Sequence, residues 1–243
     1  MDTLETEERE DETSPAARGD DDDLSPCPGE PCPKTGCAVL GTGKAMSNQL
    51  KRRLIQAELK DALPLPFAVF HELQQAAGAR IPEGMYPPAA DRGKLHDLQI
   101  GTRKLSEGDV VRVAGYLRVV RREGPESVNC KLSGASFNDI HLNVVEHAGD
   151  DEFSGFVAEV IPQERPKALE EPPLSKLMSD GVQVLIVGPL FYDTKHFVNA
   201  GPTAIPKQPK RFTLWEIHPI SQIYTCPGGG CDARRSDGWQ RLQ

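Results

Sequence analysis

The sequence predicts a mostly β protein: a five-stranded barrel, preceded by a helical extension and an acidic tail. Three observations support this fold class, namely a two-residue apolar alternation after about residue 95, one short helical segment among the predicted strands, and negative charge gathered near the start of the chain. Of 243 residues with net charge −8, residues 1–25 hold 11 acidic and two basic residues. This leaves a net charge of +1 for residues 26–243. Bulk charge therefore carries no information about what the barrel binds.

The first 94 residues are predicted to lie outside the barrel. Residues 1–45 combine the acidic run with Pro, Gly, Ser and Cys and have few large apolar residues, so we expect a disordered acidic and Cys/Pro-rich tail. Residues 46–94 are predicted as a helical extension and loop, with one helix from Ser47 to Leu63 and another from Phe67 that stops at Gly78. The barrel is assigned to residues 95–225, and residues 226–243 to a C-terminal tail.

Five segments have strand character. In residues 109–122, Val111, Val113 and Leu117 alternate with polar residues, and Gly115 suits the bend that a long first barrel strand needs. The other predicted strands are residues 139–145, 155–161, 182–192 and 211–224, and a short helix is predicted over residues 172–181, between the third and the fourth. This order is the connectivity of an OB-like Greek-key barrel. An unrelated small antiparallel barrel or sandwich stays open as the alternative.

Histidines and carboxylates recur on the polar sides of three predicted strands. Asp139 and His141 share one face of the second strand, Glu159 interrupts the apolar third strand, and Glu216 and His218 share one face of the fifth. With the strand order 1-2-3-5-4, these three strands are neighbours about 4.8 Å apart, so the side chains are expected to converge. The segment after the fourth strand adds Asp193 and His196.

Two interpretations of these polar residues stay open. A divalent metal such as zinc, iron or manganese suits His and carboxylate ligands, and it would activate water for hydrolysis. In that case His141, His218 and Glu159 would hold the metal, with His196 as a further candidate ligand. Asp139 would orient His141, and Glu216 or Asp193 would act as base. The alternative is a hydrogen-bonded network that fixes the strand register without any metal.

A stripe on the first strand raises the possibility of single-stranded nucleic-acid binding. Arg112, Tyr116, Arg118 and Arg122 share the polar face of that strand. The barrel lacks the basic surplus typical of such proteins, and only 6% of the residues are aromatic, so nucleic acid is possible but not favoured. The loop from Glu123 to Cys130 is one that OB-folds commonly use to bind ligands, although ordinary turn chemistry explains its Gly and Pro equally well.

The six cysteines allow three interpretations. Cys27, Cys32 and Cys37 lie in the tail, Cys130 in the loop after the first strand, and Cys226 and Cys231 flank a Gly-rich turn. Zinc binding by these cysteines is only weakly indicated, because the sequence lacks two CxxC pairs. Disulfides require an oxidising compartment. The third interpretation is that the tail cysteines have no fixed partner.

Several motifs together resemble an uncharacterised group of bacterial hypothetical proteins. They are EGPESVNC, DIHLNVV, AEVIPQ, FYDTKHF and LWEIHP, within roughly residues 95–240. The resemblance implies the same domain boundary and no reaction. The staphylococcal type of OB-fold nuclease uses an arginine and glutamate constellation that this chain does not match residue by residue.

The leading functional prediction is a domain that binds a small molecule or a protein of unknown specificity, without assigned catalysis. A metal-dependent, phosphodiesterase-like hydrolase and single-stranded nucleic-acid binding are the alternatives. No run approaches the roughly 18 apolar residues of a membrane helix, and the chain starts with acidic residues where a signal peptide is basic and then apolar. We therefore expect a cytoplasmic protein without membrane contact.

Overall fold

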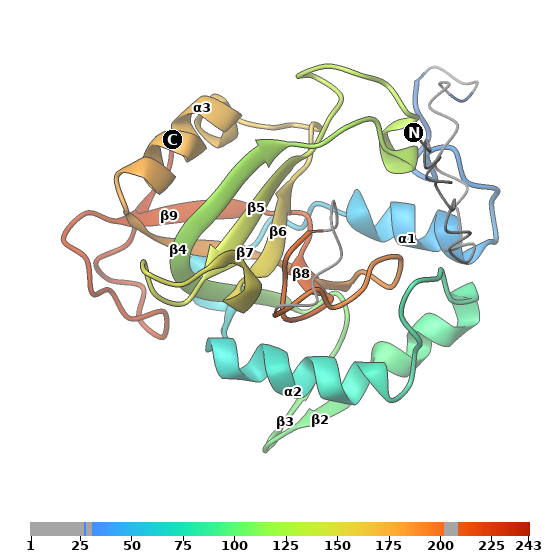
Figure 1. Cartoon of the computed structure of the whole chain (residues 1–243), viewed down its shortest axis with the longest axis horizontal. Coiled ribbons are helices and arrows are strands. Elements are labelled where there is room, and N and C mark those ends of the chain that lie inside the picture. Colours follow the sequence, from blue (N-terminus) through green and yellow to red (C-terminus); the bar gives the residue numbers. More distant parts are fainter. Residues whose placement is uncertain (1–26, 28–30, 202–208) are drawn as a thin grey trace, which may run out of the picture.

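A closed five-stranded barrel forms the centre of the molecule (Figure 1). The computed structural model describes residue 27, residues 31–201 and residues 209–243, so the acidic run over residues 1–25 of the predicted 1–45 tail lies outside the described residues. The barrel strands are β4 (Val110–Arg122), β5 (Ile140–Val145), β6 (Phe156–Val160), β7 (Gln183–Tyr192) and β8 (Trp215–Ile217). Their order is β4-β5-β6-β8-β7, and β4 also pairs with β7, which closes the barrel.

The pairings of these strands are mostly antiparallel. β6 and β8 are the exception, since they run parallel and pair at Ala158 and Ile217. α3 (Glu171–Ser179) lies between β6 and β7 in the chain, within two residues of its predicted limits. The strands β5, β6 and β8 correspond to the second, third and fifth predicted strands, and they are neighbours in the sheet. Their polar residues can therefore converge.

β4 bends near its middle and changes partner there. Residues from Val110 to Tyr116 pair with β7, and residues from Tyr116 to Arg122 pair with β5. Gly115 lies at the change, where a Cβ atom would come within 2.5 Å of the carbonyl oxygen of Val145. The bend predicted at this glycine thus follows from a close approach of two backbones, which only a residue without a side chain permits.

The barrel interior is apolar, and the segment before the barrel contributes to it. α2 (Phe67–Gly78) has the predicted limits and packs Phe70 on Phe156 with ring centroids 4.6 Å apart. Leu73, Ala77 and Ile81 belong to the same core cluster as the strands. The sequence did not predict this sharing of one core between residues 46–94 and 95–225.

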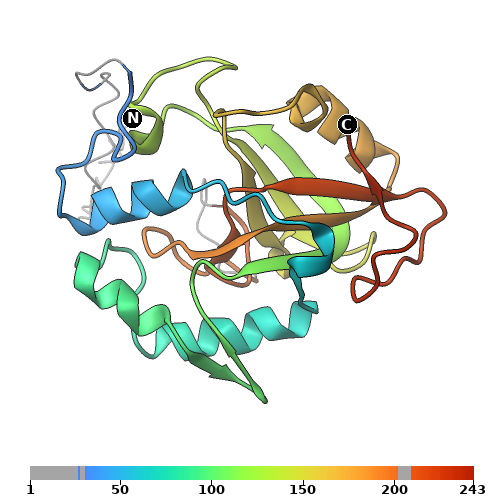
Figure 2. The same cartoon turned by 180° about the vertical axis from the view of Figure 1, so that it is seen from behind.

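Two predicted elements differ from the structure. α1 is Gly43–Lys51, not Ser47–Leu63, and its N-cap is Thr42, whose side chain accepts a hydrogen bond from the Ala45 amide. The predicted strand over residues 211–224 is divided into β8 and β9 (Gln222–Cys226), which pairs with β7 (Figure 2). The division falls at Pro219, because proline has no N–H to continue a ladder.

The remaining elements are short. They are β1 (Leu63–Pro64), β2 (Leu98–Ile100), β3 (Arg103–Leu105), β10 (Gln240–Arg241), η1 (Leu59–Asp61), η2 (Ala89–Leu95), η3 (Ser127–Asn129), η4 (Glu152–Ser154) and η5 (Lys167–Leu169). Strands β2 and β3 form a separate hairpin beyond α2 (Figure 1). None of the described helices has both the length and the apolar character that a membrane span needs.

All six cysteines form disulfides. The pairs are Cys27–Cys37, Cys32–Cys130 and Cys226–Cys231. Of the three interpretations left open for the cysteines, the disulfide is therefore the one found. The Cys32–Cys130 bridge joins the described part of residues 1–45 to the loop that follows β4. The prediction of a disordered tail is therefore wrong for residues 31–45.

Candidate functional site

The candidate site lies on the outer face of β5, β6 and β8. Residues such as Leu142, Ala158 and Ile217 point into the apolar core, and the alternating residues point outward. The outward set comprises Asp139, His141, Glu159, Glu216 and His218, all of them buried. His141 and Glu159 are direct cross-strand partners. The sequence correctly predicted that these five side chains converge.

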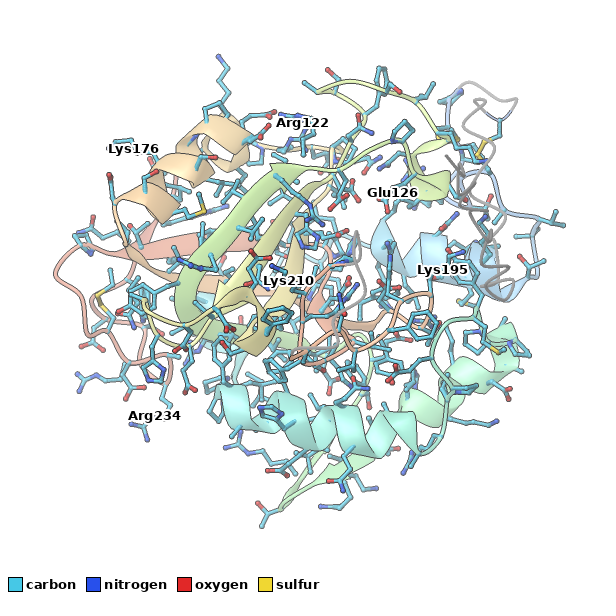
Figure 3. The ribbon with its side chains drawn as sticks, viewed as in Figure 1. Arg122, Glu126, Lys176, Lys195, Lys210 and Arg234 are labelled. Atoms are coloured by element: carbon cyan, nitrogen blue, oxygen red, sulfur yellow. A yellow bond between two sulfur atoms is a disulfide. The ribbon has the colours of Figure 1, made fainter. Side chains whose placement is uncertain are left out.

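Two other segments cover this polar face. α1 ends with Lys51, and the loop after β4 carries Glu126, whose carboxylate lies 3.8 Å from the Lys51 ammonium. Glu126 is labelled in Figure 3 on the side of the barrel that faces α1. The Cys32–Cys130 disulfide ties the chain before α1 to the same loop. An outer barrel face, which would normally be wet, is thereby closed off from water.

Glu159 lies between the two histidines. Its Oε1 is 3.3 Å from Nδ1 of His141, and its Oε2 is 3.0 Å from Nδ1 of His218. The second contact lacks the direction of a hydrogen bond, since Glu159 Oε2 is buried without a hydrogen-bond partner. One carboxylate thus faces both histidines, each with a different oxygen.

Asp139 faces His218. Its Oδ1 accepts a hydrogen bond of 2.9 Å from the Asn129 amide, and its Oδ2 lies 3.9 Å from Nε2 of His218. Asp139 Oδ2 and His218 Nε2 are both buried, and neither has a hydrogen-bond partner among the described residues. The role predicted for Asp139, orientation of His141, is therefore replaced by an unsatisfied contact with His218.

The two residues predicted as a base are engaged with Arg211. Its guanidinium donates to Glu216 Oε1 at 2.5 Å and to Asp193 Oδ2 at 3.3 Å. Asp193 also bonds His196 Nδ1 at 2.5 Å. Arg211 therefore binds both carboxylates with a single positive charge. His196, predicted as a metal ligand, pairs with Asp193 and belongs to neither group of described residues that can hold a metal ion.

Several members of the cluster were not predicted from the sequence. Glu123 lies 3.2 Å from His141, and Lys51, Glu126 and Arg211 complete the set of charges. Glu123 and Glu126 belong to the loop that the sequence singled out for ligand binding. Nothing in the sequence pattern links Lys51 or Arg211 to the site, because both arrive from segments whose placement depends on tertiary structure.

The pKa values in the cluster reflect its burial and its charges. Burial alone would lower the pKa of His218, but the negative charge of Glu159 and the polar contacts of the imidazole with Glu159 and Glu216 raise it to about 10. Burial alone would raise the pKa of Glu159, yet the positive charges of His218 and Lys51 hold it well below its usual range. For Asp139 and Glu126, burial and the charge of Glu159 raise the pKa.

Two small cavities reach the cluster. One of about 170 Å³ is lined by residues that include Glu123, His141, Glu159 and Arg211. Another of about 190 Å³ lies beside Glu126, Asp193 and His196. Lys51 lines both cavities, so it lies where each approaches the buried charges.

The predicted stripe on β4 is not a continuous surface. Arg112 is buried, and its guanidinium donates to the carbonyl oxygens of Leu59 and Arg234. Tyr116 is half-buried and Arg118 is exposed. Arg122 pairs with Glu170 and Glu171 near α3. Arg112 is thus unavailable to a ligand, which leaves the nucleic-acid prediction with less support than the sequence suggested.

Comparisons with known proteins identify no family. No family model and no curated protein matches the chain. A solved structure described as "OBody AM3L09 bound to hen egg-white lysozyme" is 16% identical and has a TM-score of 0.26, covering 49% of this chain and 82% of that chain. The resemblance to a bacterial group therefore stays a prediction.

Proposed function

We propose that this protein is a ligand-binding barrel domain of the OB-like type, and that its ligand is a divalent transition metal ion held by Asp139, Glu159 and His218. The strand order, the parallel pairing of β6 with β8 and the helix between β6 and β7 support the OB-like assignment. The three residues can each offer one ligand atom within 4.8 Å of the others. His and carboxylate ligands suit zinc or manganese.

The observation that carries this proposal is the unsatisfied pair formed by Asp139 Oδ2 and His218 Nε2. Both atoms are buried, have no hydrogen-bond partner among the described residues, and lie 3.9 Å apart. A buried polar atom without a partner costs about 1–3 kcal/mol, so two adjacent ones need a reason. Metal bonds to N and O ligands are about 2.0–2.2 Å long, so two ligand atoms of one ion lie at most about 4.2 Å apart. An ion between these atoms would satisfy both.

The surroundings of the pair support the same proposal. Nδ1 of His218 lies 3.3 Å from Glu216 Oε2 and can donate its N–H there, so an ion bound at Nε2 would displace the second proton that the raised pKa keeps on this imidazole. Asn129 holds the other oxygen of Asp139. A purely structural ion network does not explain why Asp139 Oδ2 and His218 Nε2 lack hydrogen bonds to other described residues. Metal-dependent hydrolysis is not included in the proposal, because Arg211 already binds both predicted bases.

Metal binding by D139N and H218Q tests the proposal. Protein stripped with a chelator is titrated with Zn²⁺ or Mn²⁺, and bound metal and the Tm are measured. Wild type should bind metal and gain several degrees in Tm, because an ion that binds only the folded state stabilises it. Each variant should lose this ion and most of the gain.

H147Q serves as the matched control, because His147 is an exposed histidine whose ring pairs with Asp150. It should bind metal as wild type does. If wild type binds no ion and its Tm does not respond to metal, the proposal fails.

A further inference from the structure

A second group of ligand atoms lies on the other side of Glu159. We propose that Glu123, His141 and Glu159 bind a second divalent ion, so that Glu159 bridges two metals through its two oxygens. This inference rests on the proposed function, since it adds an outer ion to the inner ion at Asp139 and His218. The three outer residues can place one ligand atom each within 4.8 Å of one another.

The outer ligand atoms have the spacing of a metal site. Nδ1 of His141 lies 3.2 Å from Glu123 Oε1 and 3.3 Å from Glu159 Oε1. Ligands about 2.0–2.1 Å from a tetrahedral ion are separated by about 3.3–3.4 Å. An ion would therefore fit here with small shifts of the side chains.

Glu159 is placed as a bridge would be. Oε1 faces His141 and Oε2 faces His218, and Oε2 is buried without a hydrogen-bond partner. Metal ions in two-metal sites are about 3.5–4 Å apart, a distance that a single bridging carboxylate spans. Among the described residues Oε2 has an ion-pair contact with His218 but no hydrogen bond, so it is open to an inner ion while Oε1 faces the outer one.

The charges in the cluster also favour added cations. Asp139, Glu159, Asp193 and Glu216 are buried carboxylates, and Arg211 is the buried arginine among them. Lys51 beside Glu126 and the His218 imidazole, whose pKa is raised, add positive charge. The four carboxylates still outnumber these three cations, so a bound metal ion would reduce the remaining negative charge.

The outer site differs from the inner site in its access to solvent. The side chain of Glu123 is 25% exposed, whereas those of Asp139 and His218 are fully buried. Glu123, His141 and Glu159 all line the cavity of about 170 Å³. Three protein ligands beside an open space leave one coordination position for water, the arrangement of an exchangeable rather than a closed site.

Arg121 competes for the same oxygen of Glu123. Its guanidinium donates to Glu123 Oε1 at 3.0 Å. The arginine side chain is 45% exposed, so it can turn into solvent when an ion arrives. The outer ion is therefore expected to bind more weakly than the inner ion.

Metal stoichiometry tests the second site. Stripped full-length protein is titrated with Mn²⁺, and bound metal per chain is measured with the electron paramagnetic resonance spectrum. Wild type should bind two ions and show the spectrum of a magnetically coupled pair. E123Q should bind one ion with an uncoupled spectrum, since Glu123 contributes to the outer site alone. H141Q should do the same, and H147Q should behave as wild type.

The outcomes separate this inference from the proposed function. Binding of a single ion by wild type, unchanged in E123Q and lost in D139N, overturns the second site and leaves the first. Binding of two ions by both wild type and E123Q also overturns the second site. Binding of no ion overturns both proposals. Because Glu123 is partly exposed, E123Q is expected to fold even if H141Q does not.

Discussion

Glu159 is the residue on which the cluster depends. Its neighbours along β6, such as Val160, are apolar, and the sequence marks it as an interruption of that pattern. The two-residue period predicts the face on which Glu159 lies, and the structure adds that Glu159 is the direct cross-strand partner of His141. The same period says nothing of which segment covers the face. Asp139, His141, Glu216 and His218 were thus predictable members of the site, whereas Lys51 and Arg211 were not.

At the same scale, Gly115 gives a prediction about stability. In G115A the new Cβ would lie 2.5 Å from the Val145 carbonyl oxygen and 3.0 Å from Val144 Cγ1. Both neighbours belong to the barrel and cannot move away freely, so we expect a loss of about 1–3 kcal/mol in the free energy of unfolding. Urea denaturation of wild type and variant measures it.

Gly124 provides the control for this substitution. Nothing lies within 4 Å of a Cβ built there. G124A should change the free energy of unfolding by no more than about 0.5 kcal/mol. Equal effects of the two substitutions would show that the close approach at Gly115 is not what determines the cost.

Among the elements, α1 and the loop after β4 decide whether the polar face is buried. The sequence misplaced α1 because Leu50, Leu54, Ile55, Leu59 and Leu63 have helical spacing. In the structure the chain after Arg52 leaves the helix, Ser221 donates to the Ile55 carbonyl, and Leu59 packs in a small cluster with Trp239. Local periodicity could not reveal these contacts, since their partners lie more than 160 residues away.

The Cys32–Cys130 disulfide should contribute more to stability than Cys226–Cys231. The two bridges span sequence separations of 98 and 5 residues. In the chain-entropy model, closure of the longer loop is worth about 4.7 kcal/mol and of the shorter about 2 kcal/mol. We expect the C32S/C130S double variant to lose about 2–3 kcal/mol more than C226S/C231S.

Thermal unfolding under non-reducing conditions measures this difference. C226S/C231S is the matched control, because it also removes one bridge and two sulfur atoms. A smaller loss in C32S/C130S than in the control would contradict the expected role of this tie.

For the molecule as a whole, one hydrophobic core includes α2 and the barrel. The sequence predicted β4 to β7, α2 and α3 closely, because each has a clear period and clear terminating residues, but it merged β8 and β9 into one strand. It assigned α2 to an extension, since no local signal shows that the apolar face of a helix packs on a distant strand. Phe70 and Phe156 make that contact across 85 residues of chain.

F70A tests whether α2 belongs to the core of the barrel. Phe70 is completely buried and stacks on Phe156. Its truncation should cost about 3–5 kcal/mol in the free energy of unfolding, with one cooperative transition for the whole molecule. F137A removes a phenylalanine that is 44% exposed and should cost far less. Two separate transitions, or similar costs for both variants, would contradict a shared core.

The pairing of the cysteines has a consequence for how the chain matures. Six thiols allow fifteen complete sets of bridges. Cys32 lies inside the short loop that Cys27–Cys37 closes, yet its partner is Cys130, which is synthesised 98 residues later. A wrong early bridge with either neighbour must be exchanged before the native set is complete. The three disulfides therefore favour an oxidising compartment over the cytoplasm that the sequence alone suggested, and recombinant chains should be exported or refolded with a thiol–disulfide buffer.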